Sequence, residues 1–330
     1  MSNELLVVKN LHTTFATAGG DLPAVDNVSF TLGRDETLGI VGESGSGKTV
    51  LARTIMGLQA RRNASVTGSV TINGIEVIGT SEEHKRQIWG TEVSMIFQDP
   101  MTSLNPVMRI GHQVDETLRL RLGMSKADAK QRAIELLGLV GIPSPEERYD
   151  VFPAELSGGM RQRVVIAIAL ACSPKLVLAD EPTTGLDVTI QAQILNLLDE
   201  LKEKLKMSVV LITHDLGVVA TRTSRIIVMY AGRIVEIGTT QDIFKDHRTP
   251  YTRALLDSAP KVSNPSHTRL VTIAGRPPNL LALENGCAFA PRCTYATEKC
   301  HNERPVLEAT GNDGHMFACW NPLTTRRGAV

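Results

Sequence analysis

The sequence has little cysteine, few aromatic residues, no net charge and no long apolar run. Aromatic residues make up 4% of the 330 residues while 42% are hydrophobic, so aliphatic side chains must supply most of any core. Lysine plus arginine equals aspartate plus glutamate at 35 each, which argues against a chain-wide field that attracts nucleic acid or an anionic membrane.

The longest apolar runs and the first residues predict no membrane span and no secretory signal. Val164 to Cys172 is among the longest apolar runs, and its nine residues fall far short of the roughly 20 that a spanning helix needs. The opening segment, MSNELLVVKN, lacks the basic region and the apolar stretch of a signal peptide. We therefore expect a soluble, cytosolic chain that contacts a membrane only through a partner.

Short β-branched runs alternate with helical patterns, which indicates an α/β fold with a largely parallel sheet. Val177 to Ala179 and Val209 to Ile212 have the composition of buried strands. Between them, apolar side chains at helical spacing predict a helix that packs on the sheet through Ile190, Ile194, Leu197, Leu198, Leu201 and Leu205. Arg225 to Gly238 predicts two strands joined by a turn at Ala231 and Gly232.

Two regions depart from this alternation. From about residue 101 to residue 156 the pattern predicts a helical insert, in which Ser125 and Asp128 form a capping box ahead of an apolar face. After about Asp246 the periodicity weakens and prolines gather at positions 260, 265, 277 and 278. We therefore expect one α/β domain over residues 1–245, with a helical subdomain at about 101–160, and a separate C-terminal region over residues 246–330.

The sequence GESGSGKT matches the phosphate-loop pattern G-x-x-x-x-G-K-[ST]. It follows an apolar strand, Leu38 to Val41, and precedes a helical run, as the motif requires. The glycines allow backbone N–H groups to turn toward phosphate, and the helix N-terminus adds positive potential. Lys48 is predicted to bind the β- and γ-phosphates of ATP, and the Thr49 hydroxyl to bind Mg²⁺. The predicted phosphate-loop residues are Gly42, Glu43, Ser44, Gly45, Ser46, Gly47, Lys48 and Thr49.

Two acids, Asp180 and Glu181, end the apolar strand that begins at Leu176. Two carboxylates at the tip of a buried strand are costly unless a cation or a proton needs them. Asp180 is suited to the Mg²⁺ shell, and Glu181 is suited to polarise an attacking water. Because these acids accompany a phosphate loop, we predict a nucleotide hydrolase rather than a loop with two solvated acids.

Upstream of these acids, LSGGMRQR at residues 156–163 resembles the signature motif of ATP-binding-cassette (ABC) ATPases. Physically, Ser157 can cap a helix whose glycine amides are free to meet phosphate. The resemblance implies a P-loop fold with a RecA-like core and a helical subdomain. It also implies that Ser157, Gly158 and Gly159 contact ATP held by an opposing subunit, so that two ATP molecules join a head-to-tail dimer.

The other motifs of that family occur in the same order over roughly residues 5–240, and the resemblance implies their roles. Gln98 in IFQDP resembles the Q-loop glutamine, which contacts Mg²⁺ and the attacking water. Asp187 in GLD resembles the D-loop, and His214 in THD resembles the switch histidine that contacts the γ-phosphate. Phe15 is the residue expected to stack on adenine, and the stretch Ala16 to Asp21 is expected to lengthen the loop that follows it.

Three longer segments resemble the ATP-binding subunits of bacterial dipeptide and oligopeptide importers. They are QDPMTSLNP at 98–106, HRTPYTRALL at 247–256 and GRPPNL at 275–280. The resemblance, to the D-type ATPase subunit of a dipeptide permease, implies ATP-driven import of short peptides and a peripheral position on the cytoplasmic face of the inner membrane. The partners it implies are a second, homologous ATPase subunit, two integral-membrane permease subunits and an extracytoplasmic peptide-binding protein.

Two other functions compete with peptide import. Nickel and other small-solute importers share the same cassette. A soluble ABC ATPase acting on nucleic acid or ribosomes belongs to a different class, but such proteins usually carry two cassettes or long inserts. This sequence has one phosphate loop, a short insert and balanced charge, all of which argue against a nucleic-acid partner.

Four of the five cysteines gather near the C-terminus, at Cys287, Cys293, Cys300 and Cys319. Disulfides are not expected in a cytosolic chain. Structural zinc commonly uses a tight C-x₂₋₄-C pair, whereas the first separations here are five and six residues. This looser spacing, together with the cysteine-bearing tail of the importer family, favours a [4Fe–4S] cluster.

Two alternatives to the cluster stay open. One is zinc, with His301 or His315 replacing a thiolate, and the other is four ordinary thiols. Cys172, in the helix after the signature motif, is predicted to be a core residue instead.

Overall fold

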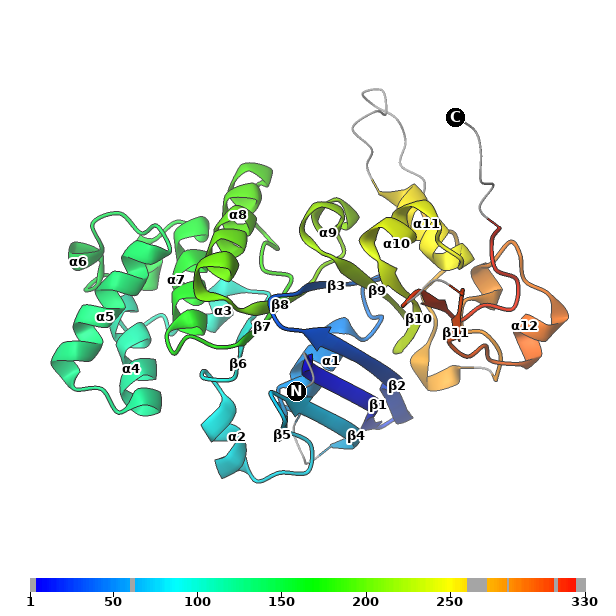
Figure 1. Ribbon diagram of the computed structural model, residues 1–330, viewed down its shortest axis with the longest axis horizontal. Coiled ribbons are helices and arrows are strands. Elements are labelled where there is room, and N and C mark those ends of the chain that lie inside the picture. Colours follow the sequence, from blue (N-terminus) through cyan, green and yellow to red (C-terminus); the bar gives the residue numbers. More distant parts are fainter. Residues whose placement is uncertain (1–3, 60–62, 260–271, 284, 312–313, 325–330) are drawn as a thin grey trace. The chain divides into compact units, whose positions relative to one another are not determined.

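Alternating strands and helices form two units in the computed structural model, which describes residues 4–59, 63–259, 272–283, 285–311 and 314–324 (Figure 1). The first unit consists mainly of Thr71–Val210, and the second combines Val7–Phe30, Thr37–Val70 and Leu211–Val330. Pro260 and Pro265, two of the prolines that suggested a C-terminal region, lie outside the described residues.

Two long strands, β1 (Glu4–Thr17) and β2 (Gly20–Gly33), lie side by side in the order β2-β1-β4, where β4 is Ala64–Ile72. The expected long loop at residues 16–21 was wrong, because both strands continue through it and only residues 18 and 19 form the turn. The Thr17 side chain stabilises this tight turn, since its hydroxyl donates a hydrogen bond to the Gly20 carbonyl. The short strand β5 (Ile75–Glu76) pairs antiparallel with the end of β4.

The second unit also contributes the neighbouring strands β11-β12-β10-β9-β3, in that order, to another sheet. Strand β3 runs parallel to β9, and β9 and β10 form the predicted antiparallel hairpin. Ala231 and Gly232 have φ of 49° and 79°, as a two-residue turn between right-twisted strands requires. The bounds of these strands are β3 Thr37–Val41, β9 Arg225–Tyr230, β10 Arg233–Thr239, β11 Glu308–Ala309 and β12 Met316–Phe317.

In the second unit, helices α9 (Leu216–Arg222), α10 (Thr240–Lys245) and α11 (Pro250–Ser258) begin at polar side-chain caps. Asp215, Thr239 and Thr249 each accept a hydrogen bond from a backbone N–H in the first turn of the helix that follows. The unit also contains α1 (Lys48–Ile55) and α12 (Glu298–Asn302), and two 3₁₀ turns span Leu280–Ala282 and Ala290–Arg292.

In the first unit, β6 (Val93–Ile96) and β7 (Leu176–Asp180) are parallel neighbours, and every residue of both strands is buried. The predicted helix follows as α8 (Val188–Leu205), ahead of strand β8 (Ser208–Ile212). Its buried face contains Ile194, Leu197, Leu198 and Leu201, as predicted, whereas Ile190 and Leu205 are only half-buried.

The predicted helical insert is present, and its helices lie together at one end of the green and cyan ribbon in Figure 1. The Ser125 hydroxyl caps α5 by accepting a hydrogen bond from the Asp128 N–H at 3.2 Å, as expected. Among the described residues, no helix is both long and apolar enough to span a bilayer. The helices of the first unit are α2 (Glu82–Ile88), α3 (Pro100–Ser103), α4 (Ile110–Leu122), α5 (Lys126–Leu139), α6 (Pro145–Arg148), a 3₁₀ turn (Pro153–Glu155) and α7 (Gly158–Leu170).

Tyr149 anchors the insert, because its side chain is 1% exposed and its hydroxyl donates a hydrogen bond to the buried Asp115 carboxylate on α4. The ring packs closely against Gly111 of α4. A Cβ atom at Gly111 would lie only 2.1 Å from the Tyr149 ring. Glycine at this position therefore allows the close approach of the two segments.

We predict that Gly111→Ala lowers the free energy of unfolding by about 1–3 kcal/mol, because the added methyl overpacks a rigid ring contact. Gly138→Ala is the matched control. Gly138 also lies in a helix, but its added Cβ would have only an ordinary 3.6 Å contact with Pro145, so helix propensity should leave stability unchanged or raised by up to ~1 kcal/mol. Urea denaturation of both variants measures the difference, and equal stabilities would contradict the prediction.

Candidate functional site

The predicted phosphate loop connects β3 to α1 in the second unit. Two of its glycines have backbone conformations and neighbours that exclude a side chain. Gly42 has φ of +155°, and a Cβ there would lie 2.3 Å from the Met229 carbonyl oxygen. Gly47 has φ of +99°, and a Cβ there would lie 2.4 Å from the Ala24 carbonyl oxygen. The loop is therefore packed tightly against its own unit.

Lys48 directs its ammonium group into this loop. Its side chain is 5% exposed, and Nζ donates hydrogen bonds to the carbonyl oxygens of Gly42 at 2.7 Å and Glu43 at 2.9 Å. The Ser46 hydroxyl lies 3.4 Å from the same nitrogen. A positive charge is thus held among backbone atoms at the N-terminus of α1, the arrangement that favours phosphate.

Glu43, the second residue of the loop, is bound by the C-terminal part of the chain. Its backbone N–H donates to the Tyr251 hydroxyl at 2.9 Å. Its carboxylate accepts from both terminal nitrogens of Arg292, at 2.6 and 2.9 Å. These hydrogen bonds raise the pKa of Arg292 above its ordinary value. Tyr251 and Arg292 were missed by the sequence analysis, since no local pattern connects residues so far apart.

In the first unit, the ends of two parallel strands bring Gln98 and Glu181 together. Ile96 of β6 pairs with Ala179 of β7, so both residues emerge from the same edge. Gln98 Nε2 donates to Glu181 Oε2 at 3.0 Å, and the Thr184 hydroxyl donates to the same oxygen at 2.9 Å. The carboxylate of Glu181 is thereby oriented by two donors. Asp180, at the end of β7, is 1% exposed.

His214 follows β8 and is exposed. The residue before it, Thr213, donates its backbone N–H to the Ile40 carbonyl of β3 at 3.2 Å. Its hydroxyl accepts from the Asp215 N–H at 3.0 Å, which fixes the turn around His214. His214 therefore emerges beside the strand that leads into the phosphate loop.

The signature motif and the D-loop begin neighbouring helices of the first unit. Ser157 caps α7 by accepting from the Met160 N–H at 3.3 Å, and Asp187 caps α8 by accepting from the Ile190 N–H at 2.9 Å. A Cβ at Gly159 would lie 2.7 Å from Cγ2 of Ile190. Packing of α7 on α8 therefore also requires this glycine, a reason that the motif alone does not indicate.

The predicted site residues thus form two groups. Lys48 and His214 belong to the second unit, as does Phe15, which is half-buried near the end of β1. The residues of the first unit are Gln98, Ser157, Gly158, Gly159, Asp180, Glu181 and Asp187.

All four C-terminal cysteines line one small cavity of about 40 Å³. Apolar and aromatic side chains, among them Phe289 and Trp320, complete its wall. Two polar groups contact the sulfur of Cys300, the Asn321 side-chain N–H at 3.4 Å and the Thr297 hydroxyl at 3.5 Å. Hydrogen-bond donors directed at a sulfur are typical surroundings of a metal-bound thiolate.

The chemistry of these thiols follows from their burial. Burial, together with the neighbouring thiols, raises the pKa of Cys319 to about 11 and also raises the pKa of Cys287 and Cys293. Within the described part of the chain, no three His, Cys, Asp or Glu side chains are arranged to hold a metal ion. Cys172 is buried in the first unit, as predicted for a core residue.

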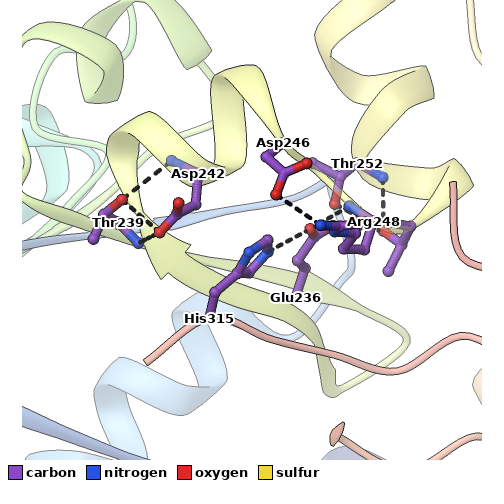
Figure 2. A network of polar contacts seen from close by, with 8 residues as sticks. Glu236, Thr239, Asp242, Asp246, Arg248, Thr252 and His315 are labelled. Carbon is purple, nitrogen blue, oxygen red and sulfur yellow. Dashed lines mark hydrogen bonds and ion pairs between the residues drawn. The ribbon is translucent and has the colours of Figure 1, made fainter. Parts of the chain in front are cut away.

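A buried carboxylate, Glu236 of β10, connects the C-terminal segments to the sheet (Figure 2). It accepts hydrogen bonds from the backbone N–H groups of Arg248 and Thr249 and from the Thr249 hydroxyl, at 2.6, 3.0 and 3.0 Å. Nε2 of the fully buried His315 lies 3.0 Å from the same carboxylate. His315, an alternative zinc ligand in the sequence analysis, is therefore engaged with Glu236.

An open groove of about 290 Å³ lies beside the Q-loop in the first unit. Trp89, Phe97 and Leu120 contribute to its lining. The lining residue Leu120 is 74% exposed, and Met101, which follows the Q-loop outside the groove lining, is 61% exposed. Such a concentration of exposed apolar side chains is typical of a protein interaction surface.

Comparison with known families agrees with this geometry. Residues 25–184 match the ABC transporter family. This matched segment includes the phosphate loop, the signature motif and the end of β7. Residues 235–300 match the oligopeptide/dipeptide transporter C-terminal region. This second segment includes Glu236, Tyr251, Arg292 and three of the four clustered cysteines.

Individual relatives extend over almost the whole chain. The oligopeptide transport ATP-binding protein OppD of Salmonella typhimurium is 50% identical over 98% of this chain and 95% of its own length. The dipeptide transport ATP-binding protein DppD of Lactococcus lactis is 52% identical over 92% of this chain and 86% of its own. A solved dimeric ATP-binding cassette, in a post-hydrolysis state with ADP and Pi, aligns with a TM-score of 0.64 at 29% identity, covering 71% of this chain and 98% of that one. The chain therefore belongs to the ABC transporter ATPases, in the family of oligopeptide and dipeptide transport ATP-binding proteins.

Proposed function

We propose that this chain hydrolyses ATP to power the import of dipeptides and short peptides across the cytoplasmic membrane. The observation that carries the proposal is the orientation of Glu181, at the edge of two buried parallel strands, by Gln98 and Thr184. A regulator without hydrolysis would have no use for a carboxylate oriented in this way. The names of the relatives, which are oligopeptide and dipeptide transport proteins, supply the solute class.

The residues of this chain divide the work of hydrolysis. Lys48 and the phosphate-loop amides bind the phosphates, Phe15 stacks on adenine, and His214 contacts the γ-phosphate. Glu181 accepts the proton of the attacking water, while Thr184 and Gln98 hold its carboxylate. Thr49, Gln98 and Asp180 are the residues that would hold Mg²⁺, which when bound would supply positive charge to the phosphates.

The site is completed by a partner. Ser157, Gly158, Gly159 and Asp187 would contact ATP bound to a second, homologous ATPase subunit, as the family resemblance implies. The caps at Ser157 and Asp187 leave the first turns of α7 and α8 ordered for this contact. ATP binding then closes a heterodimer and hydrolysis reopens it, which drives the membrane subunits between two conformations.

We assign the groove beside the Q-loop to a cytoplasmic segment of a permease subunit. The exposed apolar residues Met101 and Leu120 suit a helix with an apolar face, and the groove adjoins Gln98, which contacts Glu181. This attachment would place the chain on the cytoplasmic face of the inner membrane, opposite an extracytoplasmic peptide-binding protein. Residues 1–245 would form the ATPase domain, with its helical subdomain at about 101–160, and residues 246–330 the C-terminal region.

Leu120→Asp should weaken binding to the permeases and leave ATP binding by the isolated chain unchanged. The new charge would be buried in an apolar contact, which is unfavourable. Co-purification of the transporter with a tagged variant measures the association, and Lys126→Ala, a change at an exposed position outside the groove lining, is the control. Wild-type recovery of the permeases with Leu120→Asp would contradict the assignment of the groove.

Lys48→Ala should abolish most ATP binding, whereas Glu181→Gln should bind ATP normally and lose about 10²–10⁴-fold in turnover. The difference follows because Lys48 contributes charge to bound phosphates and Glu181 acts on water only. Peptide uptake and ATP hydrolysis by the assembled transporter measure both effects. Glu203→Gln, on the exposed side of α8, serves as the control. Normal peptide uptake with Glu181→Gln would refute the proposed function.

We further propose that the cysteine cavity would hold a metal centre, with Cys287, Cys293, Cys300 and Cys319 as ligands, once these thiols, which are not arranged to hold a metal ion in the described structure, come together around it. Support comes from the four thiols lining one cavity and from the Cys300 sulfur, which accepts a hydrogen bond from the Asn321 side-chain N–H and contacts the Thr297 hydroxyl. A [4Fe–4S] cluster is favoured over zinc by the spacing of the cysteines. The centre would be structural or regulatory, since peptide transport requires no redox step.

Anaerobically purified protein should be brown, absorb near ~400 nm and contain about four irons per chain. Cys300→Ser should lose the iron, whereas Cys172→Ser, which changes the core cysteine, should retain it. Metal analysis and the absorption spectrum are the readouts, so the test does not depend on activity. Stoichiometric zinc without iron would exclude the cluster, and protein without any metal would exclude the centre.

A further inference from the structure

Glu43 presents a problem for a loop that binds ATP. Its carboxylate is a negative charge on the second residue of the segment assigned to the phosphates. Like charges in a partly buried site repel strongly. The loop therefore needs a cation that offsets Glu43 without occupying the space of the phosphates.

Arg292 supplies that cation from the C-terminal region. Its guanidinium forms two parallel hydrogen bonds with the Glu43 carboxylate, at 2.6 and 2.9 Å, and its side chain is 5% exposed. Because the pair is shielded from water and bidentate, it is stronger than a surface ion pair. Arg292 thereby neutralises the carboxylate of Glu43, whereas Lys48 contacts the Glu43 backbone carbonyl.

The conformation of Arg292 is itself fixed. Nε donates to the Ala274 carbonyl at 2.8 Å, and a terminal nitrogen lies 3.2 Å from the Tyr230 hydroxyl. The guanidinium also lies 5.7 Å from the centre of the Phe289 ring. A side chain already held in this way loses little further entropy in holding Glu43.

A second contact acts on the backbone of the same residue. The Tyr251 hydroxyl accepts the Glu43 N–H at 2.9 Å, while the Glu43 carbonyl accepts from Lys48 Nζ at 2.9 Å. The two groups flank one peptide segment, so the position of Glu43 determines where the Lys48 ammonium can lie. Tyr251 is almost fully buried against Tyr230 and Phe289, and its ring has little freedom to move.

We propose that Arg292 and Tyr251 are positioning residues of the ATP site. Arg292 neutralises and orients Glu43, Tyr251 fixes the backbone of Glu43, and together they set the position of the Lys48 charge. The C-terminal region is then a required part of the nucleotide site rather than an appendage. This inference rests on the proposed binding of phosphate by Lys48.

The test measures the dissociation constant of MgATP for the full-length chain by calorimetry. Arg292→Ala should raise it roughly tenfold, because an uncompensated carboxylate then faces the phosphates. Arg292→Lys, which keeps the charge but loses the bidentate geometry, should give a smaller increase. Arg253→Ala removes an exposed ion pair with Asp257 on α11 and should leave the constant unchanged.

Rescue by Glu43→Gln distinguishes this mechanism from a merely structural role. In the Arg292→Ala background, Glu43→Gln removes the uncompensated charge, and MgATP affinity should return to within about threefold of wild type. If Arg292 only held the C-terminal fold, through Ala274 for example, Glu43→Gln would restore nothing, and that result would overturn the proposal.

Tyr251→Phe keeps the ring and removes the hydroxyl, so it should weaken MgATP binding several-fold without unfolding the chain. Unchanged binding by both Arg292→Ala and Tyr251→Phe would refute the inference. Lys48→Ala distinguishes a failure of the proposed phosphate site from a failure of the positioning role. If Lys48→Ala binds MgATP as wild type does, the proposed phosphate site itself fails; if only Lys48→Ala loses binding, the site stands and the positioning role fails.

Discussion

The ammonium group of Lys48 must stay charged, largely out of solvent and directed into the phosphate loop, and much of the second unit serves this requirement. A buried cation needs acceptors, which here are the carbonyl oxygens of Gly42 and Glu43. Those carbonyls are useful only if the loop cannot move, and Gly42 and Gly47 hold it by packing within contact distance of other backbone atoms. Glu43 in the same loop is held by two side chains of the C-terminal region, Tyr251 and Arg292.

The motifs of the C-terminal region acquire a physical meaning from this arrangement. Glu236 binds the backbone and the hydroxyl of Thr249, and Thr249 caps α11. Because α11 begins at a fixed point, Tyr251 in its first turn reaches Glu43. A Cβ atom added at Gly275 would lie 3.1 Å from Cγ of Arg292, so a larger residue there would press on that side chain. Both family segments thus converge on the second residue of the phosphate loop.

The sequence was a good guide to local structure and a poor one to distant contacts. The strands around Leu38 and Val177, the hairpin at residues 231–232 and the cap at Ser125 depend on neighbouring residues, so composition and spacing predict them. Gln98 and Glu181 were each assigned from a motif, but their direct hydrogen bond depends on the pairing of β6 with β7. Arg292 and Glu43 are 249 positions apart, and no periodicity reports such a pair. Thr184 was overlooked, although a hydroxyl three residues after a predicted catalytic carboxylate is a usable signal.

Strand β12 covers an edge of strand β10 that would otherwise be exposed. It pairs antiparallel with β10, where Glu236 opposes Phe317 and Ile237 opposes Met316, and the Ala318 N–H continues the ladder to the Val235 carbonyl. Without these residues β10 would present unpaired backbone donors and acceptors next to buried apolar side chains. Exposed edges of this kind recruit strands from other molecules. A chain that loses its last residues through proteolysis or premature termination would therefore be prone to aggregate even where its nucleotide motifs are intact.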